Sequence, residues 1–303
     1  MLPKLEGFAA AVLGRLDQPT LTRVVEDLGA LHATIQARGD LSAVLTDTSI
    51  ASVARGQVLG DLLAEKVSPE SLRLSVYAAT VTPAQEVPHA IDEVHFAARA
   101  LRDTGAFPHP NLGLLEARRR VGGYADALLG EITTENFAAI EDDLFRWART
   151  VEANDALRHL LLDRDAPLEA RLGLTNQLLA GKVDPVSLAL AQFTILGGRA
   201  RDVVGTLDYL VDYVARARDW RIARVHAARA LDDASQEELV SSLKALTGRE
   251  VELQIADEPD LLGGVLVEIG DLRLDATTRG RLGALREAVA SRQLLESTLN
   301  RID

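Results

Sequence analysis

The histidines and the paired carboxylates are the side chains of this sequence that could do acid–base or metal chemistry. Their spacing does not bring them together: His89 and His95 are six positions apart, which places them on different faces of a helix. Asp142-Asp143 and Asp232-Asp233 are adjacent pairs, a pattern typical of exposed helix ends. We therefore expect each of the six histidines to be an ordinary surface or core residue: His32, His89, His95, His109, His159 and His226.

The sequence signatures of common catalytic sites are missing. The chain has no Gly-x-x-x-x-Gly-Lys-[Ser/Thr] phosphate loop, no Gly-x-Ser-x-Gly nucleophile elbow and no His-Glu-x-x-His zinc pair. It has no cysteine, which excludes a thiol nucleophile, thiolate metal ligands and a disulfide framework. The sequence therefore predicts a protein that is not an enzyme and carries neither a cofactor nor a metal.

The composition favours helices and an acidic surface. The 303 residues are rich in Ala, Leu, Arg and Glu, aromatic residues make up only 4%, and the net charge is −12. An acidic chain repels phosphate backbones and anionic lipids, so neither nucleic acid nor direct membrane binding is expected. No run of 18 apolar residues occurs, and the N-terminus lacks the layout of a signal peptide. We expect the protein to stay in the compartment where it is made.

An internal repeat is the strongest signal of organisation. The stretch from Leu62 to Leu72 recurs, with the same Lys-Val-x-Pro core, from Leu178 to Leu188, which is 116 residues later. The same offset pairs Phe8 with Tyr124 and Arg55 with Arg171 without a gap. The repeat predicts two homologous helical domains, which we call copy one (residues 1–105) and copy two (residues 112–220), joined by a linker over residues 106–111 that contains two prolines.

Each copy is expected to hold about six helices. In copy one, Ser68-Pro69 is an N-cap followed by proline at the first helical position, and Thr20 or Thr22 is expected to cap the second helix. Ser49 is expected to start the fourth. In copy two, the run Arg118-Arg119-Arg120 is predicted to be a solvated helix face.

After Trp220 the hydrophobic period changes from helical to alternating, which predicts a small α+β domain over residues 221–303. Strands are expected at 222–227, at 251–255 and at 265–269, and the last of these returns through a turn at Gly270-Asp271. Ser235 is expected to cap the intervening helix, and Thr277 or Thr278 to cap a final one. Gly263-Gly264 predicts a tight turn with positive φ. The fold class is therefore mostly α, with two tandem six-helix bundles followed by a small α+β domain.

The sequence of residues 258–282 resembles the C-terminal signature of the ATP synthase delta subunit family, which includes the oligomycin-sensitivity-conferring protein. The resemblance rests on Glu258-Pro259-Asp260-Leu261-Leu262-Gly263-Gly264, Ile269-Gly270-Asp271 and Arg279-Gly280-Arg281-Leu282. Asp275-Ala276-Thr277 departs from the family at a glycine, which puts the turn type there in doubt. Residues 112–290 correspond to a standard delta subunit, and the extra copy one resembles delta subunits of some actinobacteria. These can be fused behind the b subunit, but no b-like membrane helix precedes Phe8. The chain is expected either to be free-standing or to be separated from such a fusion.

The resemblance implies a structural role in oxidative phosphorylation. A family member is a non-catalytic peripheral-stalk (stator) subunit of the proton-translocating ATP synthase, on the cytoplasmic side of the bacterial plasma membrane. It links the catalytic head to subunit b and resists rotor torque. The implied partners are the N-termini of alpha subunits and the C-terminus of b, with the crown of the beta subunits as a further contact. Membrane association would come only through the complex.

The resemblance also implies which residues bind. The alpha helix would lie in a groove between the first and fifth helices of copy two, lined by Tyr124, Leu128, Leu129, Leu188, Gln192 and Phe193. The matching positions of copy one are Phe8, Val12, Leu13, Leu72, Val76 and Tyr77. The b contact or C-terminal signature comprises Leu261, Leu262, Gly263, Gly264, Arg279, Arg281 and Leu282. Helical periodicity alone fits a bundle core equally well at the groove positions. Replacing Leu128 and Phe193 by Asp is expected to weaken alpha capture.

Two alternatives stay open at this point. A generic helical-repeat scaffold that binds peptides would also explain the duplication. Within the delta family, copy one could hold a second alpha N-terminus or contact the stalk, while copy two keeps the family groove.

Overall fold

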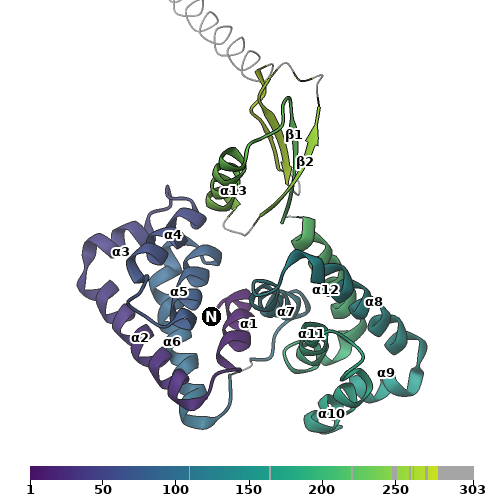
Figure 1. The fold of residues 1–303 in the computed structure, drawn as a ribbon. Coiled ribbons are helices and arrows are strands. Elements are labelled where there is room, and N and C mark those ends of the chain that lie inside the picture. Colours follow the sequence, from purple (N-terminus) through teal and green to yellow (C-terminus); the bar gives the residue numbers. More distant parts are fainter. Residues whose placement is uncertain are drawn as a thin grey trace, which may run out of the picture. The chain divides into compact units, whose positions relative to one another are not determined.

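Helices dominate the structure, with a small sheet towards the C-terminus, so the mostly α fold class is confirmed. The computed structural model describes residues 1–108, 110–163, 165–219, 221–247, 251–258, 261, 263–269 and 272–278. The chain divides into two compact units, Met1–Ala215 and Arg216–Asp303 (Figure 1). No helix in these described ranges is both long enough and apolar enough to cross a membrane.

The helices of the first unit repeat along the chain with one offset. Copy one contains α1 (Pro3–Leu13), α2 (Gln18–Ala37), α3 (Gly39–Thr46), α4 (Ser52–Leu63), α5 (Pro69–Val81) and α6 (Val87–Thr104). Copy two contains α7 (Leu114–Leu129), α8 (Phe137–Ala153), α9 (Asp155–Leu162), α10 (Leu168–Leu179), α11 (Pro185–Leu196) and α12 (Val203–Asp219). The bounds of α9 and α10 are those of α3 and α4 moved by 116 positions, the offset that the sequence repeat shows.

The N-termini of several helices are set by a side chain that accepts a hydrogen bond from a free backbone amide of the first turn. Ser68 caps α5 as predicted, because its hydroxyl accepts from the Ser71 amide. The expectation of Thr20 or Thr22 as the cap of α2 is wrong: Asp17 is the N-cap, and its carboxylate accepts from the Thr20 amide at 3.0 Å. Ser49 does not start α4 either. Its amide and hydroxyl both donate to Asp47 in the preceding turn, and the helix begins at Ser52.

The start of the fifth helix is fastened to the second helix by a carboxylate in both copies. Asp27 accepts from the Ser68 amide at 2.8 Å and from the Ser71 hydroxyl at 2.9 Å. Its counterpart in copy two, Asp143, accepts from the Asp184 amide at 2.8 Å. The two copies therefore join the same two helices through the same backbone group.

We expect Asp27→Ala to destabilise the helical unit by about 1–3 kcal/mol, because the buried Ser68 amide loses its acceptor. Urea unfolding followed by far-UV circular dichroism measures the change. Glu26→Ala is the matched control on the same helix, since Glu26 is exposed. A loss no larger than that of the control would contradict the role of Asp27.

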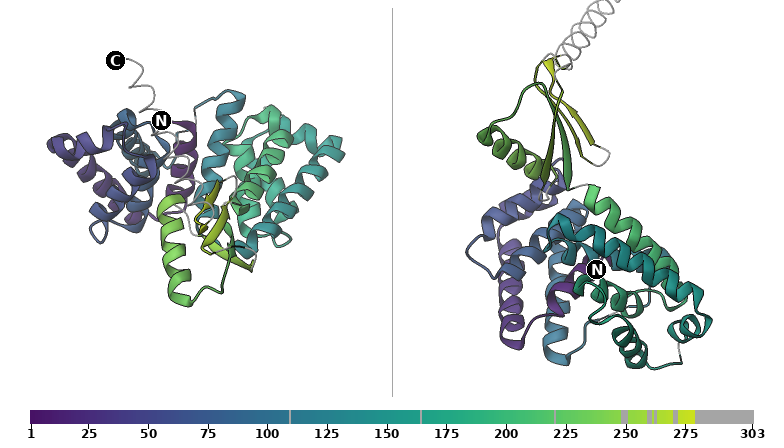
Figure 2. Two further views of the ribbon diagram at one scale, coloured as in Figure 1. Left: turned by 90° about the horizontal axis from the view of Figure 1, so that it is seen from above. Right: turned by 45° about the vertical axis from the view of Figure 1, so that its right-hand side comes forward.

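The first helices of the two copies, α1 and α7, make the most extensive helix–helix contact of the unit and lie side by side at its centre (Figures 1 and 2). They cross at two glycines. A Cβ on Gly7 would overlap the Arg120 carbonyl oxygen and lie 2.7 Å from its carbonyl carbon, and a Cβ on Gly123 would meet the Lys4 carbonyl in the same way. Gly123 stands 116 positions after Gly7, so the crossing is formed by equivalent residues of the repeat.

This crossing of α1 and α7, which we call the seam, brings side chains of copy two into the hydrophobic core of copy one. Ala127 of α7 belongs to the hydrophobic core of copy one, and Tyr124 packs against that core. Both copies therefore lie in one compact unit rather than in two that contact each other loosely.

The described part of the second unit contains a four-stranded sheet with a helix against it. The strands β1 (Ile222–Ala227), β2 (Glu252–Asp257), β3 (Val265–Ile269) and β4 (Leu272–Asp275) lie in the order β2-β1-β3-β4. β1 pairs parallel with β2 and antiparallel with β3. Alternate side chains form the core, with Ala223 and Val225 of β1 beside Val267 and Ile269 of β3 and Leu243 of α13 (Asp233–Thr247).

The predicted strands of this unit are confirmed, but the start of its helix is not. Asp232 accepts from the Ser235 amide at 2.9 Å, so α13 begins two residues before Ser235, which was expected to be its cap. Hydrogen bonding from the Ser235 side chain, together with this amide bond, holds the pKa of the Asp232 carboxyl below its usual value, because both favour the charged form. The predicted turn at Gly270-Asp271 and the predicted final helix fall on residues outside the described ranges, apart from the first residues of that helix at Thr277 and Thr278.

Candidate functional site

The residues predicted to line the partner groove of copy two fall into two classes of burial. Leu128, Leu129 and Phe193 are 1–3% exposed, so they are part of the packed interior of the isolated chain. Tyr124, Leu188 and Gln192 are half-buried. Tyr124 packs against the core of copy one, so Leu188 and Gln192 are the predicted residues that a partner could reach without rearrangement of the bundle.

An aromatic pair joins the first and fifth helices in each copy. Tyr124 stacks on Phe193 with ring centroids 3.7 Å apart, and Phe8 stacks on Tyr77 at the same distance. Both pairs are nearly parallel, and their members are related by the 116-residue offset. Burial raises the pKa of the Tyr124 phenol, because the charged form would lose hydration there. The structure thus brings together the predicted aromatic residues of each groove.

The helix α7 also reaches the fifth helix of copy one. Tyr77 on α5 donates to the Asp126 carboxylate at 2.6 Å, and Arg73 donates to the Ala127 carbonyl at 3.0 Å and pairs with Glu131. The Arg73 guanidinium lies 5.8 Å from the centroid of the Phe8 ring, within the range of a cation–π contact. In copy one, the side of α1 and α5 that carries Phe8 and Tyr77 is therefore in contact with α7.

The arginine run on α7 is only in part the solvated face that was predicted, because Arg119 is exposed but its two neighbours are engaged within the chain. Arg120 is buried in the seam, where it pairs with Glu6 at 2.8 Å and donates to the Gly197 and Pro110 carbonyls. Arg118 binds the Asp202 carboxylate with two hydrogen bonds, and this partner raises the pKa of the guanidinium. The prediction failed because the sequence of one helix does not reveal a carboxylate 114 residues away.

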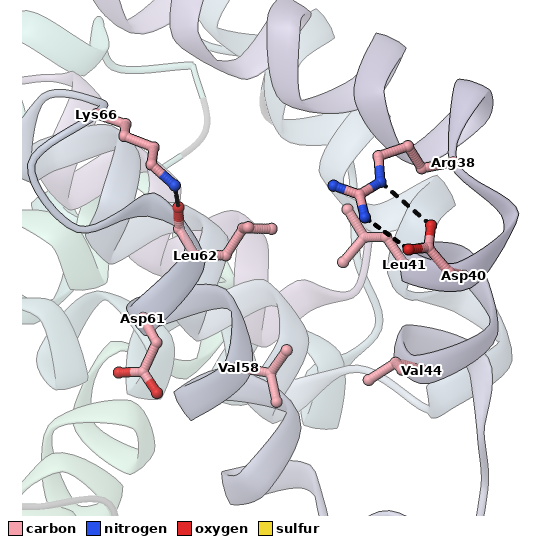
Figure 3. Close-up of a pocket in the computed structure, with 8 residues that line it drawn as sticks. All are labelled: Arg38, Asp40, Leu41, Val44, Val58, Asp61, Leu62 and Lys66. Atoms are coloured by element: carbon pink, nitrogen blue, oxygen red, sulfur yellow. Dashed lines mark hydrogen bonds and ion pairs between the residues drawn. The ribbon is translucent and has the colours of Figure 1, made fainter.

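A shallow pocket of about 480 Å³ lies between α3 and α4 of copy one (Figure 3). Its walls are mainly aliphatic, and three of its four charged residues, Arg38, Asp40 and Lys66, are engaged within the chain. Arg38 donates to Asp40, and the Lys66 ammonium donates to the Leu62 carbonyl at 2.7 Å. The lining residues are Arg38, Asp40, Leu41, Val44, Val58, Asp61, Leu62 and Lys66. Such a surface offers apolar contact and no pair of groups arranged for proton transfer.

The glycine pair of the C-terminal signature forms the entry into β3. Gly263 and Gly264 have φ of +143° and +83°, so the predicted positive-φ turn is confirmed. The Thr278 amide donates to the Gly263 carbonyl, which ties this turn to the end of β4. Asp275 accepts from the amide and hydroxyl of Thr277, so Ala276 keeps a negative φ and the missing family glycine is not needed.

Part of the predicted signature lies outside the described residues. Leu261 is half-buried beside the glycine turn, but Leu262, Arg279, Arg281 and Leu282 lie outside the described residues. Within the described ranges, no three His, Asp or Glu side chains are grouped as metal ligands would be. His226 instead pairs with Glu258 at 2.8 Å at the end of β1.

Known protein families provide the decisive comparison. Residues 121–289 match the family described as the ATP synthase delta (OSCP) subunit. The matched residues make up more than half of the chain. The chain belongs to the ATP synthase delta (OSCP) family. This family is a structural component of the ATP synthase stalk and not a catalytic enzyme, so the prediction of a non-enzyme is confirmed by membership.

Individual relatives carry the printed name ATP synthase subunit delta. The protein of Salinispora arenicola is 36% identical over 179 residues, which is 59% of this chain and 65% of the relative, so this alignment spans just under two thirds of the relative's length. Longer alignments reach the proteins of Kineococcus radiotolerans, 31% identical over 88% of this chain and 87% of the relative, and of Streptomyces avermitilis, 27% identical over 93% and 96%. The two longer alignments extend into copy one, which the family match leaves uncovered.

Proposed function

We propose that this chain is a peripheral-stalk subunit of the ATP synthase that holds the catalytic head to the b subunit and resists rotor torque. The observation that carries the proposal is membership of the delta family over residues 121–289. A stator must transmit force without deforming. The helical unit suits this task because its two copies share a core and a closely packed crossing.

In this proposal copy two and the C-terminal domain bind different partners. Copy two captures an amphipathic helix at the N-terminus of an alpha subunit, and residues 221–303 bind the C-terminus of b, with the crown of the beta subunits as a further contact. The protein is peripheral, on the cytoplasmic side of the plasma membrane, and joins the membrane only through the complex. The division into copy one, copy two and the C-terminal domain is part of the same proposal.

The captured helix would rest on the half-buried residues of α11. Leu188 and Gln192 are one helical turn apart, and Leu196, one turn further, is 39% exposed. Together they offer a mainly apolar stripe to an amphipathic partner, the helix-in-groove mode of recognition. The buried Leu128, Leu129 and Phe193 would support this surface from below rather than touch the partner over most of their area.

Leu188→Ser is expected to weaken binding of a synthetic alpha N-terminal peptide by about tenfold or more, because one apolar anchor is lost. Titration calorimetry with the intact chain measures this. Leu188→Ser is a cleaner test than the Asp substitutions at Leu128 and Phe193, since a charge at those buried positions would damage the fold itself.

The control is Val58→Ser, an exposed aliphatic residue on α4 of copy one. It should leave the affinity unchanged. Absence of binding to the unchanged, folded chain would remove the alpha-capture part of the proposal.

A further inference from the structure

We infer that the seam is a two-fold interface between homologous bundles, at which each copy recognises the other copy, of the same chain or of a second chain. The inference goes beyond the proposed function and does not depend on it. We call the surface that each copy contributes to the seam its seam face. The remaining helices of the two copies lie on opposite sides of the α1–α7 pair (Figures 1 and 2).

The backbone contacts of the seam are reciprocal. A Cβ on Gly7 would lie 2.7 Å from the Arg120 carbonyl carbon. A Cβ on Gly123 would lie at the same distance from the Lys4 carbonyl carbon. In the repeat, Gly123 is the counterpart of Gly7, and Arg120 is the counterpart of Lys4. A contact that recurs with the two copies exchanged is the mark of a two-fold interface, whereas copies stacked by translation would not show it.

One ion pair marks the axis itself. Arg15 donates to the Glu131 carboxylate at 3.0 Å, and Glu131 stands 116 positions after Arg15. A residue that meets its own counterpart lies at the two-fold axis. Two copy-one faces would therefore bring Arg15 against a second Arg15, and two copy-two faces would bring Glu131 against a second Glu131. The charges at the axis oppose pairing of like copies.

A pair of two copy-two faces would also lose the buried ion pair of the seam. Arg120 is 3% exposed and pairs with Glu6 of copy one at 2.8 Å. The counterpart of Glu6 in copy two is Gly122, which has no carboxylate to offer. Removing one partner of a buried ion pair is strongly unfavourable, so this side of the seam requires copy one.

A pair of two copy-one faces would lose a shared acceptor. Asp126 of copy two accepts from the Tyr77 hydroxyl at 2.6 Å and pairs with the Lys4 ammonium at 3.1 Å. The counterpart of Asp126 in copy one is Ala10, which cannot accept from either group. The other side of the seam therefore requires copy two, and the polar residues on both sides select the unlike pair.

Spin-label distances in the intact chain test the axis. Because the chain has no cysteine, two introduced cysteines are the only labelling sites. Asp61 and Arg23 are exposed residues of copy one, and their counterparts Gln177 and Ala139 are exposed in copy two. We expect the labels in Asp61→Cys/Ala139→Cys to be as far apart as those in Arg23→Cys/Gln177→Cys, because a half-turn exchanges the two pairs. Clearly different distances would overturn the two-fold assignment.

Two full-length variants test recognition between chains. Gly7→Leu damages the seam face of copy one only, and Gly123→Leu damages that of copy two only, since each new side chain meets a backbone carbonyl. When the two variants are mixed, copy two of the first should bind copy one of the second. Light scattering should then show a heterodimer of twice the mass of one chain. Circular dichroism verifies that each variant keeps its helices.

Each variant alone is the first control and should stay monomeric, because its intact seam face can meet only a like face in another copy of the same variant. Adding Glu131→Arg to the Gly7→Leu chain should weaken the heterodimer by about tenfold or more, since like charges then meet at the axis. Glu135→Arg, an exposed residue away from these contacts, is the matched control and should leave the affinity unchanged. No heterodimer from folded variants, or homodimers as stable as the heterodimer, would overturn the inference while the proposed function stood.

Discussion

Gly7→Ala is expected to destabilise the helical unit by about 3 kcal/mol or more. The added methyl group would overlap the Arg120 carbonyl oxygen and lie 2.8 Å from the Tyr124 amide nitrogen. All these atoms are backbone, so no side chain can rotate away to make room. The two helices must separate, and the separation opens the core that Ala127 shares with copy one.

Urea unfolding followed by far-UV circular dichroism measures this loss. Gly123→Ala should behave alike, because its Cβ would meet the Lys4 carbonyl. Gly173→Ala is the control: Gly173 lies inside α10 with no atom near its Cβ position, so alanine should stabilise the helix by about 0.5–1 kcal/mol. If the free energy of unfolding of Gly7→Ala lay within about 0.5 kcal/mol of that of the unchanged chain, the close crossing would be contradicted.

The elements that the sequence predicted well are those decided by local chemistry. Ser68-Pro69 predicts a helix start from two adjacent residues, and the alternation of Val265, Val267 and Ile269 predicts a half-buried strand. Where several candidates compete for the same cap, the sequence is ambiguous. Asp17 rather than Thr20 caps α2 because a carboxylate reaches the free amide there, and Asp232 takes the same role before α13.

The seam could not be read in the same way, because it depends on contacts between residues more than a hundred positions apart. One signal was nevertheless present. Gly7-Phe8 and Gly123-Tyr124 are a glycine followed by an aromatic residue at matching positions of the repeat. A glycine kept in both copies inside a helix marks close approach of another backbone. The family resemblance placed Leu128 and Phe193 in a groove, but they are buried, and helical periodicity does not distinguish a core from the floor of a groove.

Removing the buried carboxylate of Glu6 is the other change with a large expected effect. Glu6 and Arg120 are 2% and 3% exposed, and they pair at 2.8 Å across the seam. Glu6→Ala would leave the guanidinium buried with only the Gly197 and Pro110 carbonyls as acceptors. The cost of such an uncompensated buried charge is about 3–5 kcal/mol.

A double-mutant cycle separates this ion pair from simple loss of packing. Because Arg120→Met removes the charge that Glu6 neutralises, adding Glu6→Met to it should cost much less than Glu6→Met alone, with a coupling of about 1 kcal/mol or more. The exposed pair of Arg38 and Asp40 is the control. Asp40→Ala should change the free energy of unfolding only slightly, and only at low salt. In the buried pair the loss should persist at high salt, since counterions do not reach it. Additive effects of the two substitutions would show that the seam is held by shape alone and that its charges are incidental.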